Sequence, residues 1–153
     1  TGINLEKIAR QAGDEKSFFS KLDEISEVIA LLSEQKKKEL SKRSYFESWM
    51  DEARTAVCLY GLSGACNEIN PEAPAETAEE AILRLQKEGF CTMHMPLEES
   101  ENAFGSKDDI EGTQKILMKT GQKARKAYGF RYIAKDYREA EALLNDVPCV
   151  EIK

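Results

Sequence analysis

The sequence predicts a helix-rich α/β fold in which long helices alternate with short strands. Two observations lead to this fold class. Apolar residues recur in steps of three and four after Asp14, which is the period of an amphipathic helix. After residue 56, short apolar runs alternate with further helical segments, a pattern typical of α/β units with some parallel strand pairing.

The first long helix is expected to begin after Asp14, whose carboxylate is a favourable helix cap. The lysines at 36–38 suit its C-terminal end because they oppose the negative end of the helix dipole. Acidic residues flank these lysines, so we interpret them as a solvated face rather than a docking patch. The apolar stripe of the helix comprises Phe18, Leu22, Ile25, Ile29 and Leu32.

The middle of the chain contains a buried strand and a second helix. Residues 44–50 form an amphipathic turn with the single tryptophan, and 56–60 form a strand bounded by Gly61. After a loop at 70–76, Thr77 and Glu80 have the spacing of a capping box. The second helix then has Ala81, Leu83 and Leu85 on its apolar side and ends at Gly89.

The last third of the chain repeats this alternation. Residues 90–95 predict a strand that Pro96 ends, and 97–107 predict a polar loop. Asp108 begins a long helix that Gly129 closes. We expect its inward residues to be Ile110, Ile116, Leu117, Ala124 and Tyr128. A strand at 130–134, a helix at 138–144 and a strand at 147–152 follow, and Pro148 indicates a sheet edge or a late start of that strand.

Composition favours one cytoplasmic domain that binds neither nucleic acid nor membrane. The 153 residues suit a single domain, or a fragment of a larger protein, because the chain begins with Thr1. A net charge of -6 is unfavourable for binding phosphate backbones. The sequence lacks both the roughly 18 consecutive apolar residues of a membrane helix and the apolar core of a signal peptide. Four widely spaced cysteines indicate reduced thiols in a cytosol.

The stretch CLYGLSGACNEI at 58–69 is a glycine-rich elbow between a strand and a helix. It lacks the Gly-Lys-Ser/Thr end of a phosphate-binding loop and the three glycines of a dinucleotide fingerprint. We therefore interpret Gly61 and Gly64 as residues needed for positive φ or close packing.

Thiols and the single histidine allow a metal hypothesis. Cys58, Cys66, Cys91 and His94 have the side chains of a Cys₃His zinc site. Zinc cysteines usually occur in tight pairs, whereas these are dispersed, so we favour buried thiols and a hydrogen-bonded structural histidine. We expect neither a metal nor another cofactor.

An ordered series of short motifs resembles the anaerobic (class III) ribonucleotide reductases, which are glycyl-radical enzymes. The chain reads INLEKIA at 3–9, where that family has an Ile-Asn-Leu-Pro-Arg-Ile-Ala strand. It continues with GDEKSFF at 13–19, which is similar to the family's Gly-Asp-Glu-x-x-Phe-Phe helix start. The elbow at 61–68 resembles Gly-Leu-x-Gly-Leu-Asn-Glu, and Pro96-Leu97-Glu98 matches the end of Thr-Pro-Ala-Glu.

The resemblance covers residues 1–107, and residues 108–153 form an unrecognised helix–strand extension. Glu6-Lys7 replaces the family's Pro-Arg, and Ala65-Cys66 stands where the family has a single Leu. The family's thiyl-forming cysteine precedes the Ile-Asn-Leu motif and would therefore precede Thr1. Its glycyl-radical loop has no counterpart in the sequence.

The resemblance implies part of a glycyl-radical-type α/β barrel that contributes a substrate-pocket wall and is not catalytic alone. It implies that Glu98 is the catalytic acid and that Asn4, Ser63 and Asn67 contact a nucleotide-like small molecule. The chain would then associate with itself or with a missing upstream domain. The alternatives are a non-catalytic helical interaction module and a small Cys/His metal-binding protein. In the first of these, the stripe from Phe18 to Leu32 would be partly exposed.

Overall fold

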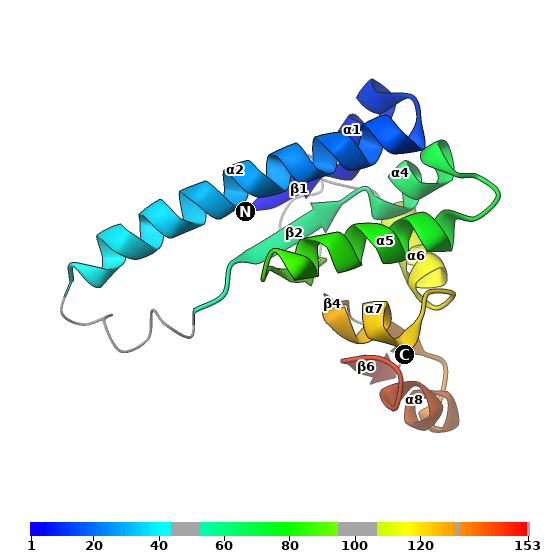
Figure 1. Cartoon of the computed structure of the whole chain (residues 1–153). Helices are drawn as coiled ribbons and strands as arrows, with labels where there is room; N and C mark the ends of the chain where they lie inside the picture. Colours follow the sequence, from blue (N-terminus) through cyan, green and yellow to red (C-terminus); the bar gives the residue numbers. More distant parts are fainter. Residues whose placement is uncertain (44–52, 95–106, 131, 153) are drawn as a thin grey trace.

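The computed structural model describes residues 1–43, 53–94, 107–130 and 132–152, which form an α/β structure rich in helix (Figure 1). The predicted turn at 44–50 and most of the predicted loop at 97–107 lie outside these residues. In chain order the elements are β1 (Gly2–Asn4), α1 (Leu5–Ala12), α2 (Glu15–Ser41), β2 (Ala56–Tyr60), α4 (Leu62–Ile69), α5 (Pro74–Lys87), β3 (Cys91–Met93), α6 (Lys107–Leu117), α7 (Gln122–Ala127), β4 (Tyr128–Gly129), β5 (Tyr132–Ala134), α8 (Tyr137–Leu144) and β6 (Val150–Ile152).

The main sheet is entirely parallel and has the order β1-β2-β3-β4. Each strand therefore lies beside the strand that precedes it in the chain. This order occurs in βα barrels, but the described strands form an open sheet with edges at β1 and β4. The α/β fold class is confirmed, and barrel closure is not.

The start of α2 agrees with the sequence prediction. Asp14 is its N-cap, and its Oδ1 accepts a hydrogen bond of 2.9 Å from the backbone N–H of Ser17. The Ser17 hydroxyl donates a further bond to Oδ2, and these bonds hold the pKa of Asp14 below its ordinary value.

Residues 3–9 differ from the family strand that they resemble. Only Gly2–Asn4 is strand, because the Asn4 side chain caps α1 by accepting from Lys7 N–H at 3.0 Å.

The apolar stripe of α2 is buried only over its first half. Phe18, Leu22 and Ile29 belong to the core, whereas Leu32 is 59% exposed. In Figure 1 the C-terminal part of α2 projects past the amino end of β2. The predicted apolar stripe from Phe18 to Leu32 is therefore partly exposed at its C-terminal end.

Two helix boundaries also differ from the prediction. α5 begins at Pro74 rather than after Thr77, and Thr77 is buried inside the helix, where its hydroxyl lies 3.4 Å from Glu15 Oε1. The predicted helix from Asp108 to Gly129 is divided into α6 and α7. Gly121 precedes α7, and its N–H donates to Glu79 Oε2 of α5 at 2.8 Å.

The elbow after β2 is a close-packed turn, as the glycine pattern predicts. Gly61 has φ of 67° and directly precedes α4. A Cβ on Gly61 would lie only 2.8 Å from the Cβ of Glu6 in α1, and one on Gly64 would lie 3.3 Å from Glu6 Cδ. The two glycines therefore let α1 and α4 pack against each other, whereas Gly89 ends its helix with φ of 80° and open space around it.

A small second sheet follows the main one. β5 and β6 pair in parallel, and β6 starts two residues after Pro148, which confirms its predicted late start. Phe130 joins the two sheets, with its ring centroid 5.0 Å from that of His94 and 5.3 Å from that of Tyr132. Tyr132 is fully buried, and its hydroxyl has no hydrogen-bond partner among the described residues.

Replacement of Gly61 by alanine should destabilise the fold more than the same change at Gly89. Both changes put a Cβ at positive φ, which costs roughly 1–2 kcal/mol. Only the change at Gly61 adds a clash with Glu6, and overpacking of this kind costs about 1–3 kcal/mol more. Urea unfolding of both variants measures the difference. Equal losses would show that contact between Gly61 and Glu6 does not constrain the elbow.

Tyr132→Phe should stabilise the chain, and more strongly at high pH. Burial raises the pKa of Tyr132 to about 12, despite the opposing effect of the Arg125 charge. The unfolded state thus loses this proton at lower pH than the folded state, so stability falls as pH rises from about 10 to 12, by about 3 kcal/mol at most. Removing a buried hydroxyl that lacks a partner also avoids its desolvation penalty.

The measurement is denaturant unfolding of wild type, Tyr132→Phe and Tyr137→Phe at pH 8 and pH 11. Tyr137 is 74% exposed, so its variant serves as the matched control and should behave like wild type. A loss of stability in Tyr132→Phe at pH 8 would contradict the expectation.

Candidate functional site

The two faces of the main sheet differ in what covers them. Side chains alternate between the faces of a strand. Ile3, Val57, Leu59 and Tyr128 belong to the hydrophobic core with residues of the helices, and they define one face. The other face is named here the non-helical face. Its residues are Gly2, Asn4, Ala56, Cys58, Tyr60, Cys91, Met93 and Gly129, which the strand registers arrange in adjacent rows.

The non-helical face combines small residues with polar side chains. Gly2 and Asn4 are exposed, Tyr60 and Cys91 are half-buried, and Cys58 is 8% exposed and lies outside the core cluster. Such a face has shallow relief and several hydrogen-bonding groups. Its hydrogen-bonding groups can contact a ligand or another protein segment, which the apolar side chains of the opposite face cannot do.

Asn4 and Tyr60 are register partners at the carboxyl ends of β1 and β2. The Asn4 carbonyl oxygen is used to cap α1, while its exposed amide can donate hydrogen bonds. Desolvation raises the pKa of Tyr60, and the nearby Cys58 thiol contributes in the same direction. Tyr60 therefore keeps its proton at neutral pH. Ligands of parallel α/β sheets commonly bind at this carboxyl edge.

Ser63 and Asn67 follow on α4, on the helical side of the elbow. The Asn67 amide donates to the Ser63 carbonyl at 2.8 Å. Ser63 is half-buried against α6, where a Cβ on Gly112 would lie 3.0 Å from Ser63 Cβ. The fold thus brings Asn4 and Ser63 to the same edge of the sheet, with Asn67 one turn further along α4. Glu98 lies outside the described residues.

The four groups of the metal hypothesis have separate surroundings. Cys58 and Cys91 are on neighbouring strands, but Cys66 is buried in α4 as part of the hydrophobic core. His94 follows β3 and packs its ring against Phe130. Within the described residues, no group of three or more His, Cys, Asp or Glu side chains is placed to hold a metal ion.

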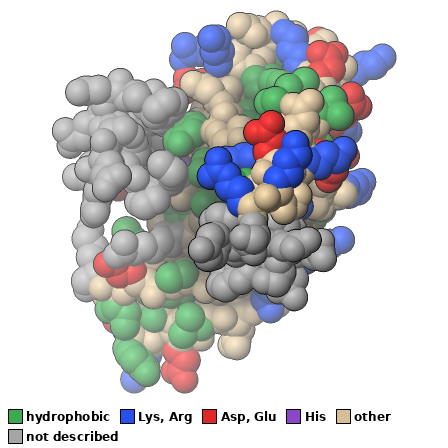
Figure 2. Space-filling model, turned by 90° about the vertical axis from the view of Figure 1, so that its left-hand side faces the viewer, with side chains coloured by type: hydrophobic (Ala, Val, Ile, Leu, Met, Phe, Trp, Pro, Cys, Tyr) green, Lys and Arg blue, Asp and Glu red, His purple; other side chains and the backbone are tan. Residues whose placement is uncertain are grey.

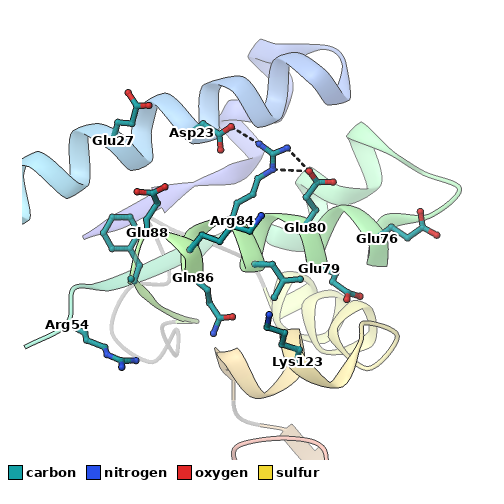
Figure 3. Close-up of a pocket in the computed structure, with 14 residues that line it drawn as sticks. Asp23, Glu27, Arg54, Glu76, Glu79, Glu80, Arg84, Gln86, Glu88 and Lys123 are labelled. Atoms are coloured by element: carbon teal, nitrogen blue, oxygen red, sulfur yellow. Dashed lines mark hydrogen bonds and ion pairs between the residues drawn. The ribbon is translucent and has the colours of Figure 1, made fainter. Parts of the chain in front are cut away.

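A broad charged groove lies along α5 (Figure 3). Its volume is about 1060 Å³, and α2, α5 and Lys123 of α7 contribute to its walls. Arg54 and Phe90, just before β2 and β3, line one end of it, and Glu76 in the first turn of α5 lines the other. The groove is not apparent from the sequence. The only local signal for it is the four-residue spacing of Glu80 and Arg84.

Arg84 joins the two helices that border the groove. Its guanidinium lies 2.6 Å from both Asp23 of α2 and Glu80 of α5, and it stacks 4.5 Å from the centre of the Phe19 ring. The hydrogen bonds that Arg84 donates to Glu80, together with the charges of Asp23 and Glu80, raise the pKa of Arg84 above its ordinary value. Because its charge is matched within the protein, we interpret Arg84 as a helix–helix contact rather than an anion site.

No protein-family model matches this chain, and neither the curated proteins nor the solved structures include one that matches it. In the described residues, no helix combines the length and the apolar content needed to cross a membrane.

We expect the purified chain to contain less than stoichiometric zinc, because Cys66 points into the core while Cys91 and Cys58 lie on the sheet. Elemental analysis of wild type, Cys91→Ser and Cys149→Ser tests this. Cys149 is exposed and outside the hypothetical set, so it is the control. One zinc per chain that is lost in Cys91→Ser and kept in Cys149→Ser would establish the metal site instead.

Proposed function

We propose that this chain is a portion of a larger α/β barrel protein related to the anaerobic ribonucleotide reductases, and that it forms one wall of a substrate pocket. The observation that carries this proposal is the all-parallel sheet in consecutive order. A second is its non-helical face of small and polar residues. In a barrel this face would be the interior, and the edges at β1 and β4 would pair with further strands.

The chain is proposed to be non-catalytic by itself. Radical reduction needs a stored radical and a thiol relay held together in a site that excludes water. The given sequence contains neither a counterpart of the family's glycine loop nor a counterpart of its thiyl-forming cysteine. What the chain is proposed to contribute is binding, through the amide of Asn4 at the carboxyl edge and through Tyr60, whose ring lies over Gly2 on the same face.

The proposed ligand is a ribonucleotide-like molecule. These groups suit the hydroxyls of a sugar, because the Asn4 amide can donate hydrogen bonds and a phenol can both donate and accept them. A carboxylate near them would add stronger bonds, each worth about 1.5–3 kcal/mol. By resemblance, Glu98 is proposed to supply that carboxylate.

Asn4→Ser should weaken ribonucleotide binding without weakening the fold. Serine and asparagine are about equally good helix caps, so α1 keeps its capping bond while the exposed amide is lost. We expect the dissociation constant to rise about tenfold, which corresponds to 1.4 kcal/mol. Titration calorimetry of the intact protein with ribonucleoside di- and triphosphates measures this.

Asn70→Ser is the matched control for Asn4→Ser. Asn70 also accepts a local backbone bond, from Ala73 N–H at 3.1 Å, but it lies at the far end of α4. Glu98→Gln should have an effect similar to that of Asn4→Ser, whereas Glu99→Gln and Glu101→Gln should bind as wild type does. If none of these nucleotides binds, or if Asn4→Ser and Glu98→Gln both bind normally, the pocket-wall proposal is wrong.

A further inference from the structure

Three sulfur-containing side chains lie together on the non-helical face of the main sheet. Cys58 of β2 and Met93 of β3 are register partners, so they lie side by side on adjacent strands. Cys91 precedes Met93 by two residues on the same strand and therefore points to the same face. The thiols of Cys58 and Cys91 and the thioether of Met93 are named here the sulfur cluster.

Glycines flank the row that contains Cys58 and Met93. Gly2 of β1 is the register partner of Cys58 on one side, and Gly129 of β4 is the partner of Met93 on the other. The Tyr60 ring covers Gly2, since a Cβ there would lie 2.6 Å from Tyr60 Cε2. The sulfur cluster is therefore bordered by an aromatic ring toward β1, while β4 contributes no side chain beside it.

The three side chains of the cluster differ in exposure. Cys58 is 8% exposed, whereas Cys91 and Met93 are half-buried. An ion from solvent can therefore meet Cys91 and Met93 first and Cys58 afterwards. The other two cysteines lie elsewhere, because Cys66 is part of the hydrophobic core and Cys149 is exposed in the segment before β6.

The strand geometry prevents a disulfide between Cys58 and Cys91. The register partner of Cys91 is Ala56, two residues before Cys58. With a strand spacing of about 4.8 Å and a rise of about 3.3 Å per residue, the Cα atoms of the two cysteines are about 8 Å apart. A disulfide requires Cα atoms within about 7 Å. A metal ion between the sulfur atoms adds two metal–sulfur bonds, which are about 2.3 Å each for a zinc thiolate, and can span this diagonal.

We propose that the sulfur cluster binds one Cu(I) ion, held by the thiolates of Cys58 and Cys91 and by the thioether of Met93. Thiolate and thioether sulfur atoms are soft ligands, which suit Cu(I). A structural zinc ion needs a complete tetrahedral set of ligands, and an iron–sulfur cluster needs a full set of cysteines. Each thiol releases its proton when the ion binds, because the thiolate is the ligand.

The Cu(I) site is distinct from the other sites considered for this chain. The zinc hypothesis requires Cys66 and His94, which pack in the core and against Phe130. Ribonucleotide binding is proposed to use Asn4 and Tyr60, which are not ligands of the metal. Copper binding and nucleotide binding are also measured separately, so failure of either proposal leaves the other standing.

Competing metal ligands are few among the described residues. In that part of the chain, His, Cys, Asp and Glu side chains form no group of three or more that could hold a metal ion. On the side of the molecule shown in Figure 2, acidic side chains are dispersed among lysine and arginine side chains. Cys149 has an exposed thiol that can bind Cu(I) by itself, so the experiment uses Cys149→Ser as the parent chain.

Anaerobic titration of the Cys149→Ser chain with Cu(I), in competition with the coloured chelator bicinchoninate, tests the proposal. We expect one Cu(I) per chain and a higher midpoint of thermal unfolding with the ion, because the ion binds the folded state. Cys58→Ser and Cys91→Ser in this parent should each raise the Kd for Cu(I) more than about 100-fold, since loss of an outer-shell partner alone costs about 10–100-fold. Cys66→Ala changes a core thiol outside the cluster, and it should bind as the parent does.

Met93→Leu tests the third ligand with little change in volume, so the fold should be kept. We expect the Kd for Cu(I) to rise about tenfold and X-ray absorption to show one sulfur atom fewer around the copper. Circular dichroism shows whether each variant keeps the fold. A parent chain that takes no Cu(I) from the chelator, or Cys58→Ser and Cys91→Ser chains that bind as the parent does, would overturn the proposal. An unchanged sulfur shell in Met93→Leu would overturn the assignment of Met93.

Discussion

Parallel pairing of β2 with β1 on one side and β3 on the other is the constraint on which the rest of the structure depends. A parallel connection must return the chain to the same end of the sheet, so each pair of strands needs helical segments between them. The long α2 and the consecutive α4 and α5 are those segments. Their apolar sides cover one face of the sheet, through residues such as Phe18, Leu62 and Leu85, and form the core.

Close packing of α1 against α4 depends on the absence of side chains at the elbow. Gly61 turns the chain directly from β2 into α4, and Glu6 lies where a Cβ on Gly61 would lie. The same region holds Asn4, which ends β1 and caps α1. The Asn4 amide, which is proposed to bind a ligand, is therefore positioned next to the contacts that determine the turn.

The non-helical face and the exposed side of α2 have different chemistry. The non-helical face carries small side chains together with the amide of Asn4 and the hydroxyl of Tyr60, which suits a polar ligand. α2 carries the exposed side chains of Leu31 and Leu32, which are apolar. The charged groove along α5 is different again, because Arg84 already has both of its carboxylate partners.

The sequence by itself determined the fold class, β2, the cap at Asp14 and the positive φ of Gly61 and Gly89, because these depend on residues within about one helical turn. The start of α5 and the division of the last long helix were decided by tertiary structure. Thr77 meets Glu15, 62 residues away, and Gly121 meets Glu79, 42 residues away. Tertiary structure likewise decides the α5 groove and the exposure of Leu32. A periodic stripe shows which side of a helix is apolar, but only the extent of the sheet decides how much of that side is buried.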